Sequence, residues 1–192
     1  MKIPSPTVAG MQAFNGIRIC LFAFFVVGSL IPNVSLAVDS ESVQTFSFPE
    51  ESKPDFTVDF PADWKMKDTE EGAYVESPDQ LVAMNVIMVD KAEAEDAQES
   101  LKKSVGERFK EILWNGGNDP EVNKDDDLGL TAIFQNAQAS DGEGTEKYSV
   151  NLVTYIRADG DKALILLCQT PLRALDKHAD AMEAVIKSIK VR

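Results

Sequence analysis

The chain has 192 residues, with 19 Lys and Arg against 32 Asp and Glu, so its formal net charge at pH 7 is −13. Binding to phosphate backbones or to anionic headgroups needs a concentration of basic side chains, and an acidic surface repels both. The composition therefore excludes nucleic acid and an anionic membrane surface as partners.

Residues 1–37 are predicted to be an export signal. The segment has the basic residues Lys2 and Arg18 and no acidic residue, and an apolar stretch from Ile19 to Ile31 follows. It ends in Ser35-Leu36-Ala37, a small-x-small cleavage site. The apolar run is shorter than the roughly 20 residues that a membrane-spanning helix needs, which favours cleavage near Ala37 over the alternative of an uncleaved anchor. The predicted location is periplasmic or extracellular.

Residues 38–55 are predicted to be a polar N-terminal leader or edge segment, and residues 56–192 a single domain. The leader is polar apart from one apolar island, Phe46-Ser47-Phe48. After cleavage the only cysteine is Cys168, so the mature chain has no internal disulfide. Because Cys168 closes an uninterrupted apolar run, we interpret it as a buried core residue and not as a reactive thiol.

The first half of the domain is predicted to be mainly strands. Apolar residues alternate with polar ones from Phe56 to Phe60, and Pro61 ends this strand. Two further strands are expected at 73–77 and 81–89, joined by a turn at 78–80. The period then changes to that of a helix over 94–114, whose apolar stripe consists of Ala97, Leu101, Val105, Phe109 and Ile112.

The second half is predicted to be a three-strand meander and a closing helix. The strands are expected at 130–138, 148–157 and 163–169, and the Asp159-Gly160 step predicts a tight hairpin between the last two. The helix begins just after Pro171 and runs toward Val191. Strands grouped in hairpins predict an α+β fold: an antiparallel sheet of about six strands covered by two helices in a three-layer α/β/α sandwich.

An exported domain with this order of elements resembles the PsbP-like superfamily. The resemblance rests on Phe60-Pro61-Ala62-Asp63-Trp64 and on the closing sequence Ala184-Val185-Ile186-Lys187-Ser188-Ile189. It covers residues 46–190, and the group includes PsbP, the periplasmic DcrB-like proteins and a Ran-binding nuclear import factor. The resemblance implies a binding or assembly module without catalysis. The metal-binding histidines of the photosynthetic branch have no counterpart here, so no functional residue is carried over.

The single histidine, His178, is predicted to lie at the border of the closing helix with its ring partly packed. Asp176 and Asp180 are each two positions away, so neither shares its face of the helix. We therefore expect His178→Gln to leave function intact, although a partner from elsewhere in the fold stays open. The acidic loop 119–127 departs from the calcium-loop template, with Lys124 in place of glycine, and is predicted to be solvated.

The sequence predicts no catalytic residue, no cofactor-binding residue and no metal ligand. The leading interpretation is an exported, non-enzymatic binding or assembly module with a protein partner in the cell envelope or a lumen. Two alternatives stay open. One is an exported hydrolase that uses only carboxylates, and the other is a weak divalent-ion-binding protein.

Overall fold

A computed structural model of the chain describes residues 42–49, 52–126 and 129–191. The predicted export signal, residues 1–37, lies outside the described residues. The described elements are β1 (Val43–Phe48), β2 (Phe56–Pro61), β3 (Lys65–Thr69), β4 (Gly72–Glu76), β5 (Ala83–Asp90), α1 (Ala94–Arg108), β6 (Lys110–Trp114), β7 (Glu121–Asp125), β8 (Leu130–Ser140), β9 (Lys147–Arg157), β10 (Lys162–Pro171), α2 (Leu175–Ser188) and β11 (Lys190–Val191). None of the helices in the described part is long and apolar enough to cross a membrane.

The strands form two antiparallel sheets. The larger has eight strands in the order β3-β4-β5-β10-β9-β8-β6, with β7 also pairing with β8, and the smaller has the order β1-β2-β11. The predicted meander is confirmed: β9 pairs with β8 on one side and with β10 on the other. The α+β fold with an antiparallel sheet is therefore as the period-two patterns indicated, with more strands than predicted.

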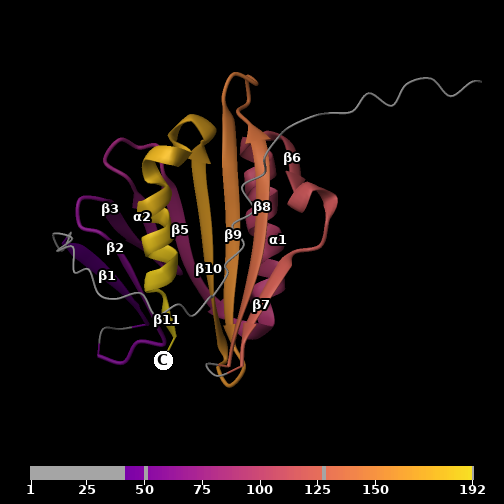
Figure 1. Ribbon diagram of the computed structural model, residues 1–192. Coiled ribbons are helices and arrows are strands. Elements are labelled where there is room, and N and C mark those ends of the chain that lie inside the picture. The colour runs from indigo at the N-terminus through magenta and orange to yellow at the C-terminus, as the bar shows by residue number, and fades with distance from the viewer. Residues whose placement is uncertain (1–41, 50–51, 127–128, 192) are drawn as a thin grey trace, which may run out of the picture. The chain divides into compact units, whose positions relative to one another are not determined.

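Each face of the large sheet has its own apolar cluster. Residues that alternate along β10 point to opposite faces, so Ile165 packs with Val105 of α1, whereas Leu164 packs with Val185 of α2. Figure 1 shows α1 behind the large sheet and α2 in front of it. The strands β1 and β2 share the α2 cluster through Phe46 and Phe60. The layer on that face is consequently a helix together with a small sheet, and not a helix alone as predicted.

The helix predicted over 94–114 is shorter than expected. Helix α1 ends at Arg108, the following Phe109 is extended, and Lys110–Trp114 form β6. Ile112 and Trp114 still pack against the α1-side cluster, now from an edge strand. The last apolar residues of this stripe can be buried from a helix or from a strand. The hydrophobic pattern therefore could not show where the helix ends and the strand begins.

Two segments that were not expected to be domain strands pair with the sheets. Residues Val43–Phe48, within the segment predicted to be a leader or edge segment, form β1 and pair with β2 along its length at the edge of the small sheet. Residues Glu121–Asp125, within the predicted acidic loop, form β7 on the edge of β8. The sequence of β7 is polar because an edge strand is exposed on several sides, whereas β1 contributes Phe46 to the core.

Candidate binding site at one end of the large sheet

Four segments that are distant in the sequence surround a depression of about 320 Å³ at one end of the large sheet. They are the turn between β4 and β5, the last residue of α1, the start of β9, and the segment from the end of β10 into the short helical turn before α2. The lining residues are Asp79, Gln80, Leu81, Ala83, Arg108, Glu146, Tyr148, Gln169, Pro171 and Arg173.

Asp79 connects this turn to α2. Its Oδ1 accepts hydrogen bonds from the Ser77 hydroxyl at 2.7 Å and from the Leu81 amide at 3.2 Å. Its Oδ2 lies 2.5 Å from the Lys177 ammonium and 3.0 Å from His178 Nε2. The turn is locally strained at Gln80, which has a φ of 60°. Asp79 therefore holds an unusual turn in place by bonding both to its own backbone and to a helix.

The hydrogen bond from Lys177, followed by that from Ser77, holds the pKa of Asp79 well below its usual value. These donors stabilise the ionised form more than burial disfavours it. Asp79 is consequently an anion at neutral pH and is unsuited to serve there as a general acid.

We expect Asp79 to make this domain more stable above pH 3.8 than below it. The pKa is 3.8 for an unperturbed Asp and lower in the folded chain, so the stabilising contribution is fully present above 3.8 and is lost as the pH falls below it. Urea unfolding of Asp79→Asn across this range should show a flatter pH dependence than wild type. The exposed Asp63→Asn is the matched control. An equally flat profile for both variants would contradict the assignment.

His178 is more deeply placed than a border residue. It is 7% exposed, its ring meets Trp64 edge-on with centroids 6.4 Å apart, and its Nε2 reaches Asp79. Sequence reasoning missed this partner because Asp79 is 99 residues away in the chain. The expectation that His178→Gln leaves function intact stays a prediction, and a glutamine amide could still donate to Asp79.

Two arginines also line the depression. The Arg173 guanidinium forms an ion pair with Glu146, and Glu146 Oε2 also accepts from the Tyr148 hydroxyl at 3.3 Å. Arg108 donates from Nη1 to the side-chain oxygen of Gln169 at 3.0 Å. Burial raises the pKa of Tyr148, so its hydroxyl stays protonated at neutral pH. No sequence motif pointed to these residues, which only the fold brings together.

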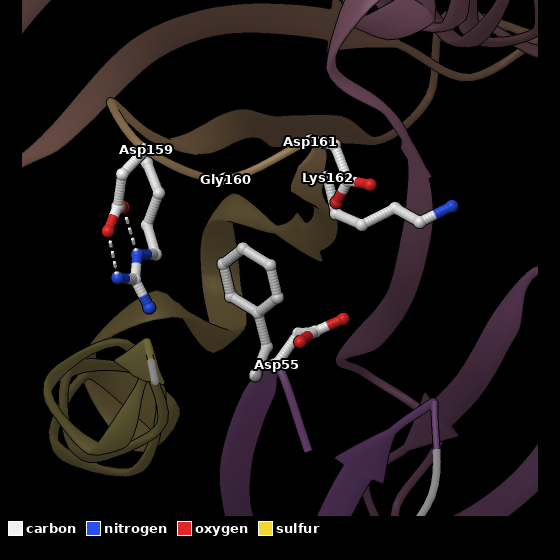
Figure 2. Close-up of a pocket in the computed structure, with 7 residues that line it drawn as sticks. Asp55, Asp159, Gly160, Asp161 and Lys162 are labelled. Carbon is white, nitrogen blue, oxygen red and sulfur yellow. Dashed lines mark hydrogen bonds and ion pairs between the residues drawn. The ribbon is translucent and has the colours of Figure 1, made fainter. Parts of the chain in front are cut away.

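A second depression, of about 500 Å³, lies between the start of β2 and the turn from β9 to β10. In Figure 2, two dashed lines join Asp159 to Arg157, at 2.8 and 2.7 Å. The Lys162 side chain extends away from Asp159 in the same view, and its amine lies 2.6 Å from Asp90. Both cations here are already paired with carboxylates. The larger depression therefore offers an incoming anion fewer free donors than the smaller one.

Two solved structures share this arrangement of sheet and helices. Cyanobacterial PsbP (CyanoP) from Synechocystis sp. PCC 6803 aligns with a TM-score of 0.55 at 14% identity, over 81% of this chain and 96% of that one. LpqN of Mycobacterium tuberculosis, involved in cell envelope biogenesis, aligns with a TM-score of 0.53 at 13% identity, over 78% of this chain and 91% of that one. The chain has a PsbP-like fold. No model of a protein family matches it, and no curated protein matches it.

A weaker likeness is to the Ran-binding protein Mog1p of Saccharomyces cerevisiae. It aligns with a TM-score of 0.48 at 9% identity, over 79% of this chain and 96% of that one. The resemblance seen in the sequence is thus confirmed at the level of the PsbP-like fold by CyanoP and LpqN.

A metal site and a cysteine nucleophile each depend on how the described residues of this PsbP-like domain are grouped and buried. Across residues 42–49, 52–126 and 129–191, no three of His, Cys, Asp and Glu lie together in a way that could hold a metal ion. The Cys168 sulfur lies 3.6 Å from the Met182 sulfur, and burial raises the pKa of its thiol to about 11. Cys168 is therefore a poor nucleophile at neutral pH.

Proposed function

We propose that this protein is an exported, non-enzymatic binding or assembly module that docks a protein partner of the cell envelope. The observation that carries the proposal is the convergence of Asp79, Arg108, Tyr148 and Arg173 from four separate segments around one depression. Asp79 is in addition bonded to His178 of α2. Such a constellation is positioned by rigid strands and helix ends, as docking surfaces are. The PsbP-like fold is compatible with this role, and its neighbour LpqN is involved in cell envelope biogenesis.

Photo-crosslinking in the native host would test the docking surface. A photoreactive amino acid replaces Gln80, which is exposed on the rim of the depression, and, as a control, Lys67, which is exposed on the edge strand β3. The full chain is expected to give a discrete protein adduct from position 80 and none from position 67. Equal adducts from both positions, or an adduct from position 67 alone, would place the partner elsewhere.

The export part of the proposal rests on residues 1–37, whose pattern is that of a cleaved signal. We expect intact-mass measurement of the protein from its native host to show a chain that begins at Val38. A stable product that begins at Met1 and partitions with membranes would instead favour the anchor.

The non-enzymatic part is tested against the hydrolase alternative. We expect glycoside and ester substrates to be hydrolysed no faster in the presence of the mature protein than in buffer alone. Turnover that is lost in Asp79→Asn or Glu146→Gln would overturn the proposal and identify the depression as an active site. Calorimetric titration with calcium tests the alternative of a weak divalent-ion-binding protein. Such a protein would give a heat of binding, and a docking module would not.

A further inference from the structure

Arg108 differs from the other arginines in the described part of the chain. Arg157 and Arg173 each bond a carboxylate, whereas the Arg108 guanidinium has an amide oxygen, that of Gln169, as its hydrogen-bond acceptor. It is exposed, in a chain with 13 more acidic than basic residues. Arg108 lines the depression, and a guanidinium has five N–H donors, so most of its hydrogen-bonding capacity is not used by the described residues.

The guanidinium is held on a rigid base. Its central carbon lies 5.2 Å from the centre of the Phe109 ring, and Phe109 is 4% exposed. The Tyr148 ring in turn packs against Phe109 with centroids 4.8 Å apart. A planar cation positioned by a buried ring loses less conformational freedom on binding, and its parallel N–H groups match the two oxygens of a carboxylate.

The charge around the depression limits which anion fits. Arg173 is balanced by Glu146, and Lys177 is balanced by Asp79, so Arg108 contributes the one uncompensated charge among the lining and adjoining residues named here. One carboxylate would neutralise it. A doubly charged phosphate would leave an excess negative charge beside two existing carboxylates, which is unfavourable at such short range.

We propose that Arg108 anchors a carboxylate of the protein partner in this depression. This inference rests on the proposed function and names the chemical group that the partner presents. The position of Arg108 at the end of α1 also suits any cation, because the helix dipole is negative there. A lysine would satisfy the dipole equally well and would lack the planar fork, so Arg108→Lys separates the two roles.

NMR titration of the mature protein with a glycine–glutamate–glycine peptide, acetylated and amidated at its ends so that it carries one carboxylate, tests the anchor directly. We expect saturable chemical-shift changes at the Arg108 Nε–H of the wild type. The dissociation constant should rise about tenfold in Arg108→Gln and about threefold in Arg108→Lys. Lys103→Gln, which removes an exposed charge from the same helix, should change the constant by less than about twofold, since surface charges act weakly at a distance. The same blocked peptide with glutamine in place of glutamate should not bind, and inorganic phosphate should bind no more tightly than the glutamate peptide.

If Arg108→Gln and Lys103→Gln weaken peptide binding equally, the effect is one of general charge and the anchor is overturned. Tighter binding of phosphate than of the peptide would also overturn it. The crosslink from position 80 distinguishes this failure from failure of the docking proposal. If Arg108→Gln leaves the adduct at the wild-type yield, the partner docks without the anchor. If wild type gives no adduct, docking itself fails. Melting temperatures of the variants confirm that each is folded.

Discussion

Gly72→Ala is expected to destabilise this domain by about 3 kcal/mol or more, because the added methyl group has no room. Gly72 begins β4 and pairs with Ile87 of β5. A Cβ there would lie 1.9 Å from the carbonyl oxygen of Val86 and 2.9 Å from its carbonyl carbon. Both are backbone atoms of the neighbouring strand, so relief requires that the two strands separate. The φ of 157° at this position is also rarely adopted by residues with a side chain.

The midpoint of urea unfolding measures this effect, and Gly106→Ala is the matched control. Gly106 lies in α1, where an added Cβ would meet nothing within 4 Å. Replacing a helical glycine at an unobstructed position should stabilise the domain by about 0.5–1 kcal/mol. The two substitutions add the same methyl group and should shift the midpoint in opposite directions. An unchanged midpoint for Gly72→Ala would mean that β4 and β5 tolerate a wider spacing.

Trp64→Ala is expected to cost about 3–5 kcal/mol, the range for removal of a large buried aromatic side chain. Trp64 lies at the corner between β2 and β3, is 5% exposed, and belongs to the α2-side cluster. Its amide bonds the Pro61 carbonyl at 3.1 Å, and its own carbonyl accepts from Gln44 of β1 at 2.6 Å. The side chain therefore packs where both sheets and α2 meet.

The unfolding free energy of Trp64→Ala tests the energetic part, and iodide quenching tests the burial. In a Trp114→Phe background, Trp64 is the remaining tryptophan and should be protected from iodide. Trp114 lies on the edge strand β6 and is partly exposed. The control is therefore Trp64→Phe, in which iodide should quench the remaining Trp114 more strongly. Free quenching of Trp64 together with an unchanged melting temperature would show that the corner is not part of the core.

The prediction of strands succeeded where one face of a strand is buried. Val82, Met84, Val86 and Met88 are all buried, as their period-two spacing indicated. The Asp159-Gly160 step correctly predicted that β9 and β10 are antiparallel neighbours. The same reasoning failed for β6 and β7, because edge strands bury little apolar area and leave a weak periodic signal. For β1 it left a leader and an edge segment as alternatives, and the structure shows an edge strand.

The candidate site could not be predicted in the same way. Asp79 and His178 occur in a turn and on a helix with no shared motif, and their contact depends on where α2 crosses the large sheet. Arg108 lies within the helix predicted over 94–114 but outside its apolar stripe, and nothing in the sequence sets it apart from other basic residues. It became distinctive only when the structure showed that Gln169, and not a carboxylate, accepts its hydrogen bond.

The sequence by itself determined the acidic character of this protein, its α+β class and most of its interior strands, because charge and hydrophobic periodicity are local properties of the chain. The tertiary structure alone decided which polar residues meet. The depression is built from four segments that lie between residues 79 and 173, and contacts over such separations are set by strand order and helix packing. These depend on the whole core at once, so no short pattern around Asp79, Arg108 or Arg173 could encode them.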